Sequence, residues 1–288
     1  MNIIRAQRDE SVMIQNKFHI TREETLEYLT FPKLSKISGI SHLFTTRMGG
    51  VSKGIYGSMN LSFSRGDDRS AVLENYHRIA KVLSTDVEHI VCSDQTHTVN
   101  IRYVSMEDAG KGVTVSKDYS DVDGLITDVP GLCLATFYAD CVPLYFVDPV
   151  KKVIGLAHSG WRGTVERMGE HMVNTMKERF GCEPADLIVA IGPSICQSCY
   201  EISEEVANRF KEGFWKDKEV LLPGKEPGKY QLDLWKANEE VLISSGILPQ
   251  NMDVTDVCTC CNSDYLFSHR ASHGQRGNLA AFLMLRKS

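Results

Sequence analysis

The sequence lacks an apolar run long enough to cross a membrane. Its longest apolar stretch, GLCLATFYADCVPLYFV at residues 131–147, is interrupted by Asp140 and Pro143 and is shorter than the span of about 20 residues that a bilayer requires. The first eighteen residues interleave charged and apolar side chains and contain no apolar segment of the kind found in secretory signals. We therefore expect a soluble, cytoplasmic protein with no membrane partner.

Basic clusters are also scarce. No run of lysine and arginine exceeds two residues, and the formal net charge is -5. Such a chain has no general electrostatic attraction for the phosphates of nucleic acids. We expect small-molecule partners and no nucleic acid.

Linkers, internal repeats and low-complexity segments are missing as well. With 288 residues, of which 42% are hydrophobic, the chain can build a sizeable core, and we expect a single domain over residues 1–288. Its nine cysteines are an odd number in a chain without a secretion signal. Free thiols are therefore expected in place of a disulfide framework.

Helical and strand patterns alternate along the chain. Apolar residues at helical spacing predict helices at about residues 70–84, capped by Ser70, and 163–181, ended by Gly181; shorter helices are expected after Ser203 and over 233–246. Short β-rich runs lie at residues 42–47, 131–139, 143–148, 153–158 and 186–193. The runs 143–148 and 153–158 are too close for a helical crossover, so they should pair antiparallel, and the fold class is α/β with mixed sheets.

Three segments place a metal-binding side chain at the end of an apolar run or within one. They are QTH at 95–97, ADC at 139–141 and AHSGWRG at 157–163. His97, Cys141 and His158 would supply three zinc ligands and leave the fourth position open, as in catalytic zinc sites. Two alternatives use the same residues: core packing, or a metal-free cysteine hydrolase with Cys141 as nucleophile and either histidine as base.

Glycines surround Trp161 and Arg162 just before a predicted helix. Gly160 and Gly163 would let the backbone turn and a ligand approach closely, and Arg162 at a helix N-terminus favours an anion. An ordinary turn with a solvated arginine is the alternative.

A second glycine-rich segment, HLFTTRMGGVSKGIYGSMNLS, surrounds Arg47 and ends near Asn60. It suggests a loop fitted to a polar substrate, and a flexible hairpin is the alternative. Near the C-terminus, Gly274 and Gly277 come directly after HRASH at residues 269–273. This favours a loop beside the site over a metal-binding helix.

The remaining cysteine motifs are weaker. Cys196-x-x-Cys199 is a possible redox pair, although no thioredoxin-like helix follows it. Cys258, Cys260 and Cys261 in CTCC lack a second ligand cluster at zinc-ribbon spacing, so core packing is expected for them.

Taken together, the motifs resemble one family: the bacterial YfiH/YlmD-like proteins, also called the laccase-domain or multicopper polyphenol oxidoreductase family. The matching stretches occur in consistent order between residues 43 and 285. They are TTRMGGVS, NLS at 60–62, QTH, DGLIT at 123–127, ADCVPLYFVDP, GLAHSGWRGT, AIGPSI followed by CYEI, DLWKAN, and CT followed by FSHR.

The resemblance implies a single-domain, four-layer α/β/β/α sandwich. It also implies a zinc site formed by His97, Cys141 and His158. One departure is the segment Arg276-Gly277-Asn278, where family members commonly carry Thr-Gly-Arg, and this puts substrate contacts from that loop in doubt.

Two activities are associated with the family. Multicopper polyphenol oxidation (laccase chemistry) needs many histidines, typically in H-x-H pairs, whereas this chain has nine histidines and no such pair. The other activity is phosphorolysis of adenosine, inosine, guanosine and methylthioadenosine, with some deamination of adenosine. We favour this second activity, with Zn²⁺ as cofactor and Cu²⁺ as the other possible metal.

This activity assigns expected roles to several residues. Arg47 or Arg162 would hold phosphate against C1′ of the ribose, and Asn60 and Gln95 would contact the substrate. Deamination needs an activated water and a carboxylate that moves protons. Asp140, next to Cys141, is the candidate carboxylate, although strand alternation would point it to the opposite face.

Overall fold

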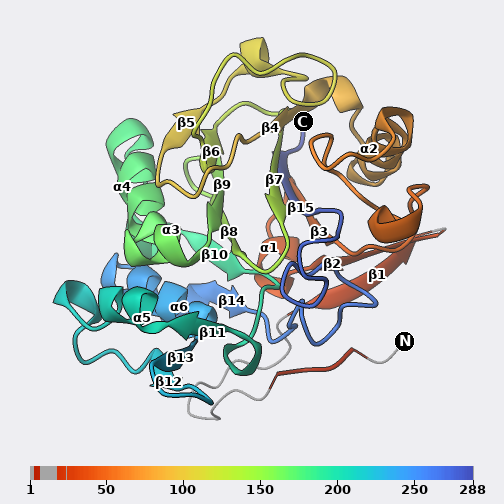
Figure 1. Ribbon diagram of the computed structural model, residues 1–288. Helices are drawn as coiled ribbons and strands as arrows, with labels where there is room; N and C mark the ends of the chain where they lie inside the picture. Colours follow the sequence, from red (N-terminus) through yellow and green to blue (C-terminus); the bar gives the residue numbers. More distant parts are fainter. Residues whose placement is uncertain (1–2, 7–17, 24, 288) are drawn as a thin grey trace.

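Two six-stranded mixed sheets form the centre of the computed structural model, which describes residues 3–6, 18–23 and 25–287 (Figure 1). The first sheet has the order β1 (His19–Glu23), β2 (Leu26–Thr30), β3 (Ile40–Thr45), β15 (Leu279–Leu285), β7 (Cys133–Tyr138) and β4 (Ile90–Cys92). The second has the order β14 (Met252–Val254), β10 (Ile188–Ile191), β8 (Val142–Asp148), β9 (Val153–Ser159), β6 (Gly124–Thr127) and β5 (Ile101–Tyr103). A small third sheet contains β11 (Glu201–Ser203), β13 (Lys229–Leu232) and β12 (Leu221–Pro223).

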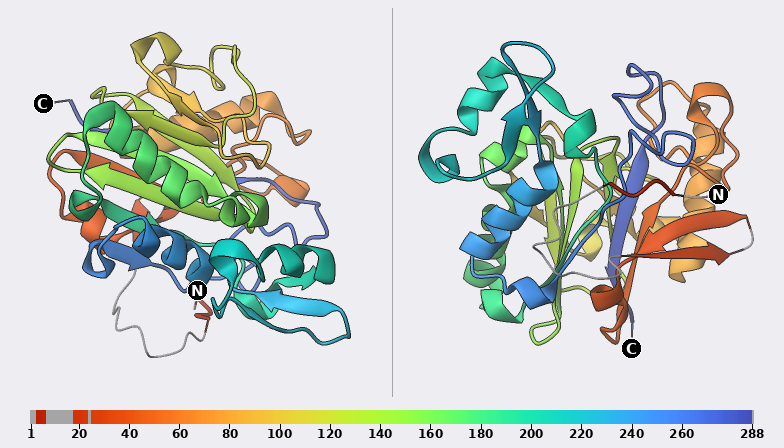
Figure 2. Two further views of the ribbon diagram at one scale, coloured as in Figure 1. Left: turned by 90° about the vertical axis from the view of Figure 1, so that its left-hand side faces the viewer. Right: turned by 90° about the horizontal axis from the view of Figure 1, so that it is seen from below.

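The two large sheets face each other, and helices cover their outer faces (Figure 2). The helices are α1 (Pro32–Ser35), α2 (Arg69–Leu83), α3 (Trp161–Val165), α4 (Met168–Phe180), α5 (Glu204–Arg209) and α6 (Leu234–Ser244). Helix α2 packs on the first sheet, and α4 and α6 pack on the second. None of the helices in the described part of the chain is long and apolar enough to span a membrane.

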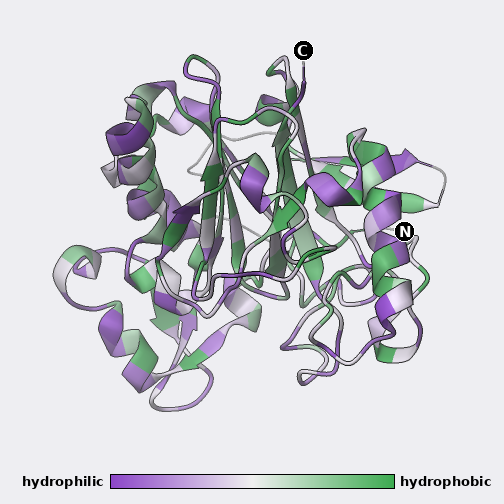
Figure 3. Cartoon of the chain, turned by 90° about the horizontal axis from the view of Figure 1, so that it is seen from above, coloured by the Kyte–Doolittle hydropathy of each residue, from purple (hydrophilic) through white to green (hydrophobic). Residues whose placement is uncertain are grey.

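Buried hydrophobic residues gather on the central strands (Figure 3) and form three clusters, two between a sheet and its helices and one at the interface between the two sheets. Two buried tyrosines cross this interface. The hydroxyl of Tyr138 donates to the carbonyl of Ala157 at 2.9 Å, and that of Tyr145 donates to the carbonyl of Leu43 at the same distance. These bonds link the two sheets and give both tyrosine hydroxyls a partner.

Most of the predicted elements are present. The mixed α/β class is confirmed, and β8 and β9 pair antiparallel as expected, from Val142 opposite Ser159 to Asp148 opposite Val153. Two details were wrong. Helix α2 is capped by the carboxylate of Asp68, which accepts from the amides of Ser70 and Ala71. The helix expected over 163–181 is divided into α3 and α4 because Arg167 adopts a left-handed conformation (φ 61°).

His42 on β3 is a buried histidine that acts as a hydrogen-bond acceptor. Its Nε2 accepts from the amide of Phe31 at 2.8 Å, which requires the neutral ring. Burial lowers the pKa of His42 from 6.5 to about 4. Between these two values the unfolded chain binds a proton that the folded protein does not, so this residue lowers stability as the pH falls from 6.5 to 4.

We expect His42→Gln to remove this part of the acid sensitivity. Glutamine keeps an oxygen that can accept from the Phe31 amide but does not titrate. In urea unfolding, the unfolding free energy of the wild type should fall relative to that of the variant by about 3 kcal/mol between pH 7.5 and pH 4. An equal difference between the two proteins at both pH values would contradict the prediction.

Candidate functional site

The fold brings His97, Cys141 and His158 to one place. His97 lies in the loop after β4, Cys141 in the turn between β7 and β8, and His158 near the end of β9. Their ligand atoms all lie within 4.8 Å of one another, and the Cys141 Sγ is 3.9 Å from the His97 Nε2. His158 is buried, Cys141 is partly exposed and His97 is exposed. The trio is thus anchored in the protein on one side and open on the other.

Asp123, just before β6, organises this trio. One of its carboxylate oxygens lies 2.8 Å from the His158 Nδ1, which leaves the Nε2 free to bind a metal. The same carboxylate accepts from the backbone amides of Thr96, His97 and Thr98 at 3.0–3.1 Å. Asp123 therefore orients His158 and holds the loop that carries His97. The backbone of this loop adopts a positive φ of 68° at His97.

The electrostatics of the site favour an ionised thiol. Burial alone would raise the pKa of Cys141, but the neighbouring His158 and His97 lower it to about 6. Burial would lower the pKa of His158, whereas Cys141 and Asp123 raise it to about 9. Cys141 is thus a thiolate at neutral pH, the form in which cysteine binds metals or attacks an electrophile.

Gly160, which precedes α3, is required for close approach. A Cβ at this position would lie 2.9 Å from the Cys141 Sγ and 3.0 Å from the His97 Cδ2. A Cβ at Gly163 would make only ordinary contacts. The close-approach role expected for the two glycines therefore belongs to Gly160, and any side chain there would displace the side chains of Cys141 and His97.

A cavity of about 780 Å³ lies against the trio. This volume is in the range of small-molecule binding sites. All three members of the trio line it, and so do five cationic side chains and two carboxylates: Arg65, Lys117, Arg162, Arg270, Arg276, Asp94 and Asp140. The excess of positive charge favours an anionic ligand.

Of the residues expected to contact substrate, Gln95 and Arg162 line the cavity. The Gln95 amide pairs with the backbone of Phe137, accepting at 2.6 Å and donating at 2.7 Å, so its position is fixed. The Arg162 guanidinium is exposed and lies 4.5 Å from the centre of the Trp161 ring. Arg162 can therefore turn to a ligand without breaking an ion pair within the described part of the chain.

Arg47 and Asn60 do not line the cavity. The guanidinium of Arg47 donates to the carbonyls of Gly57 and Ser263, both at 2.8 Å, and stacks on the Phe267 ring. Asn60 is fully buried and accepts from the amide of Asn278 at 2.9 Å. Both side chains hold neighbouring loops together, which is a different role from the substrate contact expected of them.

Asp140 lines the cavity, but both of its carboxylate oxygens are engaged. One accepts from the Thr259 hydroxyl at 2.6 Å and the other from the Arg270 amide at 2.7 Å. The residue adopts an unusual φ of 92°. Asp140 thus fixes the loop that follows β14, and these bonds compete with the proton transfer that was expected of it.

The segment that departs from the family pattern does contribute to the cavity. Arg276 is only 9% exposed, and its Nε, with no partner in the described structure, is a buried unpaired donor. Burial and the nearby Arg65 lower the pKa of Arg276 to about 10, so it stays charged at neutral pH. His269, in the predicted C-terminal loop, also lines the cavity, as expected for a loop beside the site.

Comparison with known proteins gives a consistent result. Residues 41–286 match the family described as multi-copper polyphenol oxidoreductase laccase. The chain is 40% identical over 245 residues to purine nucleoside phosphorylase YlmD of Geobacillus stearothermophilus, covering 83% of this chain and 88% of that one. It is 31% identical over 248 residues to adenosine deaminase RL5 of an unknown prokaryotic organism, covering 85% and 93%. The crystal structure of the Bacillus licheniformis hypothetical protein YfiH superimposes with a TM-score of 0.87 at 33% identity, covering 94% and 100%.

Proposed function

We propose that this chain, which belongs to the multi-copper polyphenol oxidoreductase laccase family, is a zinc-dependent purine nucleoside phosphorylase. Its substrates would be phosphate with adenosine, inosine, guanosine or methylthioadenosine, and deamination of adenosine would be a second activity. The observation that carries the proposal is the open His-Cys-His trio in the wall of a cavity that is rich in arginine. The names of the relatives support an enzyme of purine nucleoside metabolism.

The donor set fits zinc. Two imidazoles and one thiolate are ligands that Zn²⁺ favours, and the carboxylate of Asp123 on His158 is the usual outer partner of a zinc-bound histidine. A copper site of the same ligands commonly adds an axial methionine, and no described residue lining this cavity is a methionine. When bound, zinc supplies a Lewis acid that lowers the pKa of water, which is the chemistry that adenosine deamination requires.

Arg276 and Arg65 are the best candidates for the phosphate site. The buried Arg276 has an unpaired Nε, and Arg65 lies close enough to lower the pKa of Arg276. An anion bound between them would accept a hydrogen bond from this Nε and offset the repulsion between the two guanidinium groups. In phosphorolysis, a phosphate oxygen bonds to C1′ while the bond from C1′ to the purine nitrogen breaks. The purine leaves with the electron pair and takes up a proton, which gives free base and ribose 1-phosphate. Arginines that hold phosphate at C1′ would supply positioning and offset its charge.

The test is the dependence of base release on phosphate. With adenosine or inosine, we expect free base and ribose 1-phosphate in equal amounts, at a rate that saturates with phosphate. Arg276→Gln should raise the KM for phosphate by about 10-fold or more, with a smaller effect on the KM for nucleoside. Arg209→Gln, on the exposed end of α5, is the control and should change neither value. Base release that ignores phosphate would refute phosphorolysis.

One observation favours a second function, a cysteine hydrolase. The Asp123 carboxylate contacts the His158 ring, and His158 in turn neighbours Cys141, which is the spatial arrangement of an acid, a base and a nucleophile. The pKa of the Cys141 thiol is also lowered. This function predicts activity that survives metal removal and is lost on alkylation of the thiol.

A further inference from the structure

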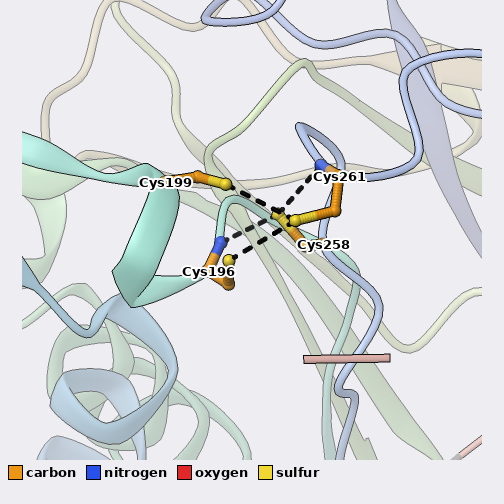
Figure 4. Close-up of side chains that lie close together, drawn as sticks. All are labelled: Cys196, Cys199, Cys258 and Cys261. Carbon is orange, nitrogen blue, oxygen red and sulfur yellow. Dashed lines mark hydrogen bonds between the residues drawn. The ribbon is translucent and has the colours of Figure 1, made fainter. Parts of the chain in front are cut away.

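Four cysteines outside the His97 site lie together in the structure. Cys196 and Cys199 follow β10, and Cys258 and Cys261 follow β14 (Figure 4). Their four sulfur atoms all lie within 4.8 Å of one another. The sequence shows no second ligand pair at zinc-ribbon spacing, which is why core packing was expected for Cys258 and Cys261. The fold brings a distant pair, Cys196-x-x-Cys199, beside them.

The sulfur positions fit a tetrahedral metal ion. Four thiolates at the Zn–S distance of about 2.3 Å define a tetrahedron with sulfur-to-sulfur edges of about 3.8 Å. The Sγ of Cys261 lies 3.5 Å from that of Cys199 and 4.0 Å from that of Cys196. Both distances are close to this edge, so an ion could bind with little movement of the chain.

The backbone around the cluster also suits bound thiolates. The amides of Cys196 and Cys261 both point to the Sγ of Cys258, at 3.2 and 3.4 Å. Amide donors stabilise the negative charge that a thiolate ligand carries. The two loops are bridged as well, since Ser194 pairs with Cys258 and the Thr259 amide donates to the Ser194 carbonyl at 3.0 Å.

A disulfide, an iron–sulfur cluster and plain core packing each fit the four thiols less well. Sulfurs 3.5 Å apart are not bonded as a disulfide, whose S–S length is about 2.05 Å. A four-iron cluster would hold its thiolates farther apart, because each binds a different iron. Core packing does not require two C-x-x-C pairs with all four sulfurs turned to one point.

The cluster lies behind one wall of the substrate cavity. Ile195 and Tyr200, which flank the first cysteine pair, line the cavity. Arg270, a third lining residue, donates from its guanidinium to the carbonyl of Cys199 at 3.0 Å. An ion at the cluster would thus join two loops that would otherwise be held by a few hydrogen bonds, and would fix this wall.

We propose that Cys196, Cys199, Cys258 and Cys261 bind one structural zinc ion, distinct from the ion at His97, Cys141 and His158. This inference does not depend on the proposed enzymatic activity. The ion ties the loop after β10 to the loop after β14 and so holds the wall formed by Ile195, Tyr200 and Arg270.

The experiment is elemental analysis of the full-length protein purified without added metal, in a Cys141→Ala background that disables the first site. We expect one zinc ion per chain in this background and less than about a tenth of that after Cys199→Ser and Cys261→Ser are added. Cys260→Ser, which alters the neighbouring thiol outside the group, is the matched control and should keep the ion. Absence of zinc from the Cys141→Ala protein, one iron per chain in its place, or retention of zinc by the double-serine variant would overturn the proposal.

A second measurement covers the case in which the double-serine variant does not fold. The Cys141→Ala protein is stripped of metal by acidification with chelator and titrated with Co²⁺ under reducing conditions. One equivalent should produce intense thiolate-to-cobalt charge-transfer absorption and the visible bands of tetrahedral cobalt, and Zn²⁺ should displace them. Absorption typical of octahedral cobalt without charge transfer would refute a four-thiolate site.

Discussion

Cys141→Ala is expected to abolish phosphorolysis and deamination, with a loss of at least about 1,000-fold in kcat/KM, and to remove one zinc ion per chain. The thiolate lies 3.9 Å from the His97 Nε2, and among the three ligands it alone carries negative charge. Without it, the two imidazoles alone would bind Zn²⁺ weakly. Activity is measured by product formation from adenosine and inosine, and zinc by elemental analysis.

Cys260→Ser is again the appropriate control, since it removes a partly exposed thiol that belongs to neither group of potential ligands. It should leave both activities and the zinc content of the first site unchanged. A fully active Cys141→Ala protein would show that the assigned site is wrong. Wild-type protein that holds no zinc at this site, keeps its activity in chelator and is inactivated by alkylation would favour the cysteine hydrolase instead.

The proximity of Cys141 and His158 was predictable from sequence because both residues stand at strand ends, whereas His97 lies in the loop after β4. QTH, ADC and AHSGWRG interrupt or end apolar runs, and the hairpin of β8 and β9 places Cys141 and His158 at the same end of neighbouring strands. Strand ends can be located from local patterns. The hairpin was also predictable, since only four residues separate its strands.

The roles of the arginines were not predictable in the same way. Arg47 stands in a glycine-rich segment that looks suited to an anion, but its guanidinium binds the carbonyl of Ser263, 216 residues away. Arg276 stands in a segment that departs from the family pattern, yet it lines the cavity. The direction in which a long side chain points depends on loops that only the tertiary structure brings together.

The four-cysteine cluster illustrates the same limit. Cys199 and Cys261 are 62 residues apart, and no local spacing relates them. They meet because β10 and β14 pair in parallel, so that the loops following both strands begin at the same edge of the sheet. Each C-x-x-C pair was visible in the sequence, but their proximity depends on a strand pairing that the local patterns did not predict.

Asp123 was also missed, although it begins the DGLIT motif. A lone aspartate before an apolar run gives no sign of its partners, which are the His158 ring and three amides of the 96–98 loop. Burial alone would raise the pKa of Asp123, but His158 and the backbone amides lower it. The residue is therefore an ionised carboxylate that is almost entirely surrounded by donors.

Asp123→Asn is expected to weaken zinc binding at the trio by about 10- to 100-fold and to lower phosphorolysis in proportion. The asparagine amide offers one acceptor oxygen where the carboxylate offers two, and its NH₂ group would face donors such as the Thr96 and Thr98 amides. The variant should also lose about 3 kcal/mol in unfolding free energy, because a buried ionic contact is broken. Zinc affinity is measured by competition with a chromogenic chelator.

The loss of zinc affinity and the loss of unfolding free energy can be measured separately. Comparing them decides whether Asp123 positions the ligands or only stabilises the fold. A purely structural role predicts lower stability with unchanged zinc affinity in the fraction that remains folded. A positioning role predicts weaker affinity in that fraction, together with activity that excess zinc partly restores. Asp121→Asn is the matched control, since its exposed carboxylate accepts from the Thr96 hydroxyl and makes no contact with the His158 ring. Equal losses of affinity in both variants would contradict a special role for Asp123.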